Sequence, residues 1–272
     1  MSWLEISRGD APLVVSFPHT GTDIPADIEA KFVSPWLARK DADWYVDQLY
    51  GFARARGATT IRTAISRSVI DVNRDPSGAS LYPGQATTEL CPTVSFDGEP
   101  LYAPGDEPDT TEINRRRAVW FTPYHVAIED ELARLKGRHG RVVLYDAHSI
   151  RSVVPRLFEG ELPHFNIGTN RGTTCHPDLT AAVEAACGSE FSRVTNGRFV
   201  GGWTTRHYGR PEAGFHAVQM ELACRGYLDE PQETAEATWP VPYSPARAAK
   251  LQQRLEAILS ACITFALSPS GA

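Results

Sequence analysis

The sequence lacks the motifs that mark several large enzyme classes. Its 272 residues contain no G-x-S-x-G elbow, no G-x-G-x-x-G turn, no P-loop and no H-E-x-x-H pair. Interpretations as a serine hydrolase, a nucleotide-binding protein or a zincin protease therefore lose their main support.

Cysteine is scarce, and long hydrophobic runs are missing. The five cysteines are scattered and form no C-x-x-C pair, a pattern that favours reduced thiols over a disulfide framework. The first residues lack the basic and apolar regions of a signal peptide, and no apolar run approaches membrane-spanning length. We therefore expect a cytoplasmic protein without a membrane partner.

An excess of positive charge is also absent. The formal net charge of −6 argues against nucleic acid as the main partner. A small anionic substrate remains compatible, because it needs only a local cluster of arginines. The chain is long enough to bury a full core and shows no internal repeat or linker, so we expect a single domain over residues 1–272.

What the chain does contain is an alternation of β-branched runs and helical patterns. The expected strands are 12–17, 58–63, 68–72, 142–145, 164–169 and 215–222. The expected helices are 27–32, 41–56, 111–135, 177–186 and 244–267. Residues 75–111 suggest a long excursion that could cover a site, and residues 198–210 a loop or hairpin. This order predicts an α/β fold.

Polar side chains follow several of these strands. His19 follows the first strand, Arg74 the third, and His148 the central one in an Asp146-x-His148 sequence, while Glu221 lies late in the strand 215–222. In open α/β sheets, ligands bind at the carboxyl ends of the strands. Two imidazoles and a carboxylate are the protein half of a catalytic zinc site, and a further glutamate can act as general base. Each residue alone also has a structural explanation, but together they predict a metal-dependent hydrolase.

Six motifs resemble the N-formylglutamate amidohydrolase family, whose members are deformylases of a histidine-degradation route. The resemblance runs from about residue 12 to residue 230, with the motifs in the family order. The motifs are Pro-His-Thr-Gly-Thr-Asp-Ile-Pro (18–25), Asp-Ala-Asp-Trp-Tyr-Val-Asp (41–47), Ser-Arg-Ser-Val-Ile-Asp-Val-Asn-Arg (66–74), Tyr-Asp-Ala-His-Ser (145–149), Phe-x-Gly-Gly-x-x-Thr-Arg-His-Tyr-Gly-Arg-Pro (199–211) and His-x-x-Gln-x-Glu (216–221).

The resemblance carries implications for fold and chemistry. The family is similar in fold to zinc carboxypeptidases and aspartoacylases (phosphorylase/hydrolase-like), with a mixed, mostly parallel sheet between helices and one zinc ion (Zn2+) or another divalent metal. It implies His19 and His148 as metal ligands and Glu221 as the catalytic base. Asn73 and Arg74 match the Asn-Arg pair that holds a substrate carboxylate and polarises the scissile carbonyl.

The third metal ligand is open at this point. Zinc carboxypeptidases place a carboxylate three residues after the first histidine, and this chain has Thr22 there. We prefer Asp43, with Asp41 and Asp23 as the alternatives.

The substrate carboxylates call for arginines, whose planar fork binds a carboxylate with two hydrogen bonds. We favour Arg206 and Arg210 over Arg198, because they lie in the Thr-Arg-His-Tyr-Gly-Arg-Pro run that matches the family. His216 faces the other side of its strand from Glu221, so a structural role is expected. Asp146 either orients a ligand histidine or caps a turn.

The sequence therefore predicts a metal-dependent amidohydrolase that cleaves N-formyl-L-glutamate to formate and L-glutamate. Its partner is a small anionic substrate, and we expect no nucleic acid or membrane partner. Two alternatives remain. One is an enzyme for another N-acyl amino acid or a small peptide, and the other is a binding protein that keeps the fold without turnover.

Overall fold

The computed structural model describes residues 2–80, 84 and 86–269 of the chain. Its strands are β1 (Leu4–Ser7), β2 (Leu13–Phe17), β3 (Thr59–Thr63), β4 (Val142–Ile150), β5 (Phe165–Gly168), β6 (Arg193–Thr195) and β7 (Phe215–Ala223). Its α-helices are α1 (Ala26–Glu29), α2 (Val46–Leu49), α3 (Thr110–Arg116), α4 (Thr122–His139), α5 (Pro177–Ala186), α6 (Trp203–Tyr208) and α7 (Pro245–Leu267). Short 3-10 helices are η1 (Leu37–Arg39), η2 (Gly51–Arg56), η4 (Pro211–Ala213) and η5 (Cys224–Gly226), and the π-helical turn η3 (Arg117–Phe121) joins α3 to α4.

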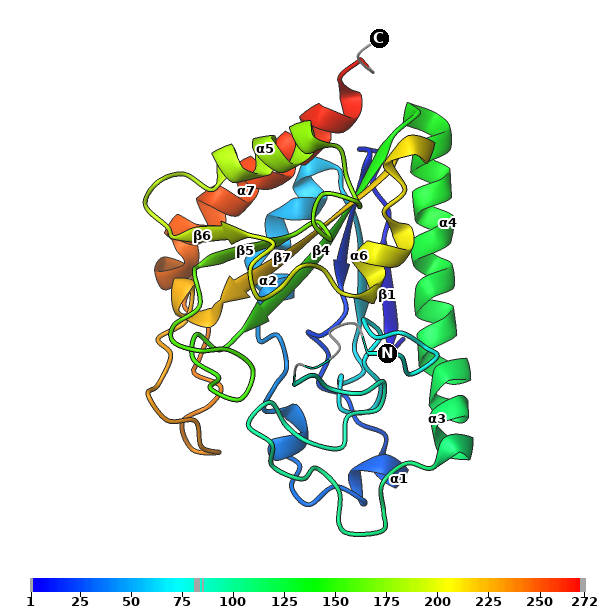
Figure 1. Cartoon of the computed structure of the whole chain (residues 1–272), viewed down its shortest axis with the longest axis vertical. Helices are drawn as coiled ribbons and strands as arrows, with labels where there is room; N and C mark the ends of the chain where they lie inside the picture. Colours follow the sequence, from blue (N-terminus) through cyan, green and yellow to red (C-terminus); the bar gives the residue numbers. More distant parts are fainter. Residues whose placement is uncertain (1, 81–83, 85, 270–272) are drawn as a thin grey trace.

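The strands form one mixed sheet in the order β1-β3-β2-β4-β7-β5-β6 (Figure 1). The four strands β3, β2, β4 and β7 are mutually parallel, whereas β1 pairs antiparallel with β3 at one edge. Toward the other edge, β5 runs antiparallel to β7 and parallel to β6. The predicted α/β class, with a mixed and mostly parallel sheet between helices, is confirmed.

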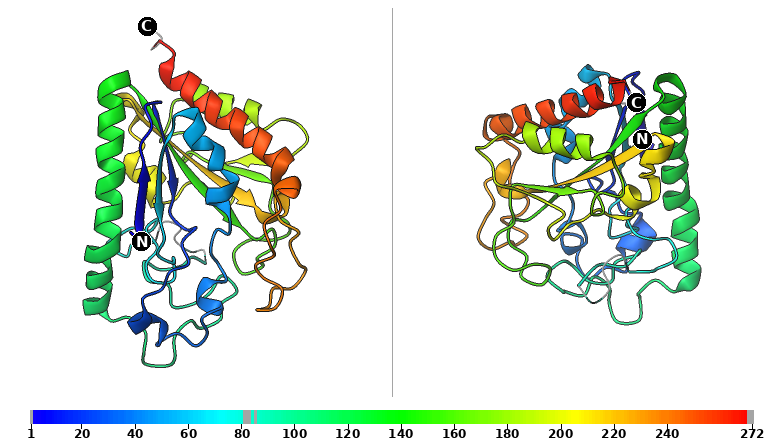
Figure 2. Two further views of the ribbon diagram at one scale, coloured as in Figure 1. Left: turned by 180° about the vertical axis from the view of Figure 1, so that it is seen from behind. Right: turned by 45° about the horizontal axis from the view of Figure 1, so that its top comes forward.

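Helices cover both faces of the sheet, which explains why β4 is apolar along its first half. Val142 and Leu144 pack in the cluster that includes α4, whereas Val143 and Tyr145 pack in the cluster that includes α5 and α7. A strand buried on both faces needs apolar side chains at successive positions rather than at every second one. Figure 2 shows α4 on one face, with α5 and α7 on the other.

The carboxyl ends of the central strands point toward the loop-rich end of the molecule, at the bottom of Figure 1. The long segments between β2 and α3 gather there. No helix in residues 2–80, 84 and 86–269 is long and apolar enough to cross a membrane.

Three local predictions were wrong, each for a physical reason. Residues 68–72 are not a strand but a buried turn, in which the Asp71 amide donates to the carbonyl of Leu90 rather than to a neighbouring strand. The expected helix 41–56 is split, because Tyr45 has a left-handed φ of 64° that no α-helix accommodates. The expected loop 198–210 contains α6.

A buried histidine on α4 ties that helix to the turn before Asn73. The His125 Nε2 lies 2.8 Å from the Val72 carbonyl oxygen and Nδ1 lies 3.1 Å from the Tyr208 hydroxyl. Burial lowers the pKa of His125 from 6.5 to about 3, so the ring is neutral in the folded protein.

We expect this histidine to weaken the fold in acid. Below pH 6.5 the unfolded chain protonates a group that the folded chain keeps neutral, so stability falls as the pH drops toward 3, by up to about 1.4 kcal/mol per pH unit. Urea unfolding between pH 4.5 and 7 measures this slope. His125→Gln should flatten the slope, with His139→Gln on the same helix as the control, and an unchanged slope in His125→Gln would contradict the assignment.

Candidate active site

Three parallel strands deliver the central side chains of the site. His19 lies two residues beyond the end of β2, and His148 and Glu221 lie on β4 and β7. His148 is the direct register partner of Glu221, and Asp146 is that of Gln219. Register partners face the same side of a sheet, so these four side chains are brought to one surface.

His19, Asp43 and His148 converge closely enough to hold a metal ion, and all three are buried. The Nδ1 atoms of His19 and His148 lie 3.1 Å apart. Asp43 Oδ2 lies 3.0 Å from His148 Nδ1 and 3.7 Å from His19 Nδ1. Ligands of a tetrahedral zinc ion lie roughly 3.3 Å from one another, given metal–ligand bonds of about 2.0–2.1 Å. The three atoms therefore have the spacing that a divalent metal requires.

Asp43 enters the site from the turn before α2. Its amide donates to the carbonyl of His19 at 3.0 Å, and its Oδ2 accepts the Ser149 amide at 3.2 Å. The alternative carboxylates lie elsewhere. Asp41 accepts the amide of Phe96, and Asp23 is exposed in an isolated bridge to Ile65.

A second carboxylate orients each histidine. His19 Nε2 lies 2.7 Å from Asp71 Oδ1, and His148 Nε2 lies 2.9 Å from Asp146 Oδ2. A carboxylate at Nε2 favours the proton there and leaves the Nδ1 lone pair for a metal. Two such lone pairs 3.1 Å apart repel one another unless a cation lies between them. The donor set therefore fits a bound cation.

The pKa values of Asp43, His148 and Asp71 also show that positive charge is stabilised beside the buried carboxylates. Burial favours neutral Asp43, but hydrogen bonds with His148 and His19 hold its pKa well below the ordinary value. Burial opposes a charged His148, but Asp146 and Asp43 hold its pKa well above the ordinary value. Likewise Asp71 is buried, but Arg74, His19 and Arg67 hold its pKa well below the ordinary value.

Glu221 is the buried carboxyl group beside these ligands. Burial raises the pKa of Glu221 to about 7, the range in which a group can both accept and release a proton at neutral pH. Gln219 Nε2 donates to Glu221 Oε2 at 3.2 Å, and Gln219 Oε1 accepts the amide of Gly202 at 2.6 Å. The Glu221 side chain is thus held in place by a carboxamide that accepts a hydrogen bond from the Gly202 amide.

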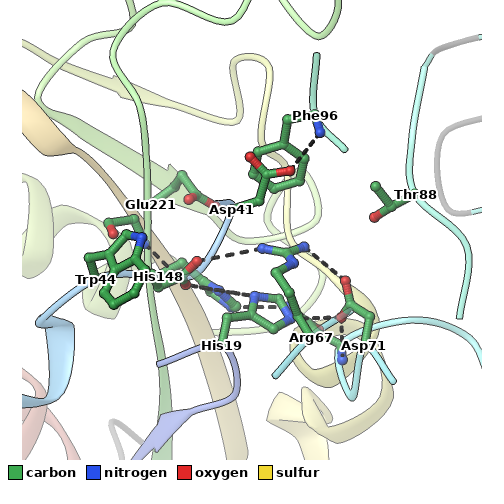
Figure 3. A network of polar contacts seen from close by, with 12 residues as sticks. His19, Asp41, Trp44, Arg67, Asp71, Thr88, Phe96, His148 and Glu221 are labelled. Atoms are coloured by element: carbon green, nitrogen blue, oxygen red, sulfur yellow. Dashed lines mark hydrogen bonds and ion pairs between the residues drawn. The ribbon is translucent and has the colours of Figure 1, made fainter. Parts of the chain in front are cut away.

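Arg67 and Asp71 belong to the site although the sequence interpretation assigned them no role. Figure 3 shows the Arg67 guanidinium reaching Asp71 on one side. Its Nη2 lies 2.8 Å from Asp71 Oδ2, its Nη1 lies 3.5 Å from Asp43 Oδ1, and its guanidinium lies over the Phe96 ring. Both residues lie in the motif 66–74, but their place in the site was overlooked because residues 68–72 were interpreted as a strand.

Asn73 and Arg74 lie at the same end of the sheet. The Asn73 amide group donates to Asp146 Oδ2 at 3.1 Å, and its oxygen accepts the Thr204 amide at 2.9 Å. A Cβ on Gly202 would lie 2.4 Å from Asn73 Nδ2, so only glycine allows this approach. Arg74 donates to the carbonyl and hydroxyl oxygens of Thr88.

A pocket opens in front of these side chains. Its lining combines metal-site residues, arginines and apolar side chains. The residues are His19, Arg67, Asn73, Arg74, Ala86, Thr87, Thr88, Phe96, His148, Ile150, Leu157, Arg198, Phe199, Gly202, Gln219 and Glu221.

The two arginines preferred from the sequence are not part of this lining. Arg206 donates to the carbonyl of Gly201, and Arg210 is exposed with its guanidinium over the Phe215 ring. Residues 203–208 of the segment form α6, and Gly202, directly before this helix, lines the pocket. The structure instead places Arg198 in the pocket lining. His216 lies apart from the site, and its ring packs against Phe265 on α7.

Comparison with known proteins identifies the family. A family model described as N-formylglutamate amidohydrolase matches residues 11–228, a range that contains every residue of the pocket lining. The chain belongs to this family. Relatives of the N-formylglutamate amidohydrolase family named N-formylglutamate deformylase are 46% identical in Pseudomonas aeruginosa and 40% identical in Pseudomonas putida. Each alignment covers 94% of this chain and 96% of the relative.

Two solved structures agree with the fold. A crystal structure of N-formylglutamate amidohydrolase from Ralstonia eutropha JMP134 matches with a TM-score of 0.71 at 25% identity, covering 98% of this chain and 97% of that one. A gene product of Agrobacterium tumefaciens matches with a TM-score of 0.68 at 17% identity, covering 96% and 95%. The first match and the curated relatives support the family, and the second supports the fold alone.

Proposed function

We propose that this member of the N-formylglutamate amidohydrolase family hydrolyses N-formyl-L-glutamate to formate and L-glutamate with the help of a bound divalent metal. The observation that carries the proposal is the convergence of His19 Nδ1, Asp43 Oδ2 and His148 Nδ1 beside the buried Glu221. The names of the relatives supply the substrate, and the arginines of the pocket lining suit its charge.

Two imidazole nitrogens and one carboxylate oxygen suit zinc, and three protein ligands leave a position for water. A bound zinc ion lowers the pKa of such a water and so supplies a nucleophile at neutral pH. His19, Asp43 and His148 are the residues that would hold the ion. Asp71 and Asp146 would keep the two imidazoles in the correct orientation.

Glu221 acts as the general base and then as the general acid. Its carboxylate takes a proton from the attacking water as the water oxygen bonds to the formyl carbon. The carbon–nitrogen bond then breaks, and Glu221 returns the proton to the leaving nitrogen. The second proton of the water passes from the new carboxyl group to the released amine, so the products are formate and L-glutamate with a protonated amino group, and atoms and charge balance.

The cationic and amide side chains position the substrate and stabilise developing charge. Arg74 and Asn73 line the pocket, where they would bind the substrate near the scissile bond. The Arg74 guanidinium would hold a carboxylate, and both side chains would offer donors to the carbonyl oxygen. Arg67 offers a further buried positive charge next to Asp71 and Asp43. An anionic amino-acid derivative therefore meets a complementary surface.

A substrate panel tests the function. With zinc added, formate release should be fastest from N-formyl-L-glutamate, and removal of metal with a chelator should abolish release until zinc is restored. N-formyl derivatives of neutral amino acids should react about 100-fold more slowly, because they lack the side-chain carboxylate that the pocket arginines attract. A folded, metal-loaded protein that releases no formate from any N-formyl amino acid would favour the binding-protein alternative.

A further inference from the structure

Two arginines of the pocket are held at the two ends of one short segment. Arg74 donates through Nε to the Thr88 carbonyl at 2.9 Å and through Nη2 to the Thr88 hydroxyl at 2.8 Å. Arg198 donates through Nη2 to the Ala86 carbonyl at 3.0 Å. All three residues of the segment 86–88 line the pocket, together with both arginines. The segment therefore sets the spacing between two guanidinium groups.

Arg198 is further fixed by its own surroundings. Its Nε donates to the Leu157 carbonyl at 2.7 Å, and its guanidinium lies 5.3 Å from the Phe199 ring centroid. A guanidinium located by two backbone carbonyls and a ring loses little further freedom when it binds a carboxylate. The Arg198 guanidinium is thus pre-organised to bind an anionic group.

Arg74 and Arg198 have different neighbours in the pocket. Arg74 lies 3.6 Å from Asp71, the carboxylate that orients His19. Arg198 lies instead beside Leu157 and Phe199, which pack on the apolar cluster of Phe96, Ile150, Val154, Leu162 and Ala223. In an N-formyl amino acid the α-carboxylate is one carbon from the scissile nitrogen, whereas the side-chain carboxylate of glutamate is three carbons away. The near carboxylate therefore suits Arg74, and the far one suits Arg198.

We propose that Arg198 binds the side-chain carboxylate of the substrate and, with Arg74 spaced by the segment 86–88, selects N-formyl dicarboxylic amino acids of glutamate length. The proposal rests on the function proposed above and specifies its substrate class. The two ends of the segment are at most about 7 Å apart, and the carboxyl carbons of an extended glutamate are about 5 Å apart. Each guanidinium can thus reach one carboxylate, and apolar side chains of the pocket lining can pack on the methylene groups.

Arg198→Met, assayed with N-formyl-L-glutamate and N-formyl-L-glutamine, tests the assignment. The two substrates have nearly the same shape but differ in one charge. For the variant, kcat/KM on the glutamate substrate should fall about 100-fold, mainly through KM, because the far carboxylate loses its cationic partner. On the glutamine substrate kcat/KM should change by less than about threefold. Arg156→Met, an exposed arginine outside the pocket lining, is the matched control and should leave both rates unchanged.

Several outcomes would overturn the proposal. If Arg198→Met lowers both rates equally, Arg198 only supports the segment 86–88. If Arg206→Met or Arg210→Met removes the preference instead, the specificity arginine is in or next to α6. If the wild-type protein hydrolyses both substrates equally well, no side-chain carboxylate is selected, although the hydrolase function stands.

Inhibition of the wild-type protein gives a second measurement that needs no variant. Glutarate, which has two carboxylates at the glutamate spacing, should inhibit at least about tenfold more strongly than butyrate, which lacks one of them. Equal inhibition by both would count against a two-arginine site. Failure of every N-formyl substrate would instead refute the proposed function itself, so the two failures are distinguishable.

Discussion

Glu221→Gln is expected to lower kcat for N-formyl-L-glutamate by about a thousandfold while leaving the bound metal in place. Glutamine has the size of glutamate and can still meet the Gln219 side chain, but it cannot accept a proton from water. Because Glu221 is outside the group formed by His19, Asp43 and His148, the variant keeps all three candidate ligand atoms. Formate release and metal content of the same preparation measure the two effects separately.

The matched control for this variant is Glu129→Gln, at an exposed position on α4. It changes the charge of the protein by the same amount and should leave kcat unchanged. If Glu221→Gln turns over at the wild-type rate, the base is another group. If Glu221→Gln loses its metal, Glu221 is part of the ligand set.

His148→Ala and Asp43→Ala are expected to lose the metal and, with it, at least about 99.9% of the activity, since a bound metal ion contributes several kcal/mol to transition-state stabilisation. Each variant removes one of three converging ligand atoms. Asp41→Ala provides the contrast, because Asp41 interacts with the amide of Phe96 and with Arg151 rather than with the histidines. Its metal content should equal that of the wild type.

Metal content after dialysis, with thermal unfolding as the check on folding, measures this prediction. Loss of metal from Asp41→Ala but not from Asp43→Ala would reverse the assignment of the third ligand. Retention of metal by His148→Ala would mean that the ligand atoms lie elsewhere.

Much of the site could be predicted from the sequence, because strand ends are recognisable. His19, His148 and Glu221 were placed at the ends of apolar runs, and parallel pairing of β2, β4 and β7 brings them together. Asp43 was chosen through the family resemblance, and its contact with the histidines depends on a turn that begins where Tyr45 adopts a left-handed conformation. No periodic pattern indicates such a turn.

The arginines show where sequence reasoning failed. Arg67 was overlooked because a buried, β-branched run was taken for a strand, although its amides find partners in a turn. Arg206 and Arg210 were preferred because they lie in the run that matches the family, and the pocket lining contains Arg198 instead. Which face of α6 meets the pocket depends on the approach of Gly202 to Asn73, a contact between residues far apart in the chain.

The hydrogen bonds that hold the candidate ligands have a consequence for how the proposed metal would be bound. The Asp43 amide donates to the carbonyl of His19 and its carboxylate accepts from the amide of Ser149, while the imidazoles contact Asp71 and Asp146. In a zinc finger, by contrast, the ion is needed for folding. Here hydrogen bonds between protein groups also hold the ligands, so their placement does not rest on the ion alone.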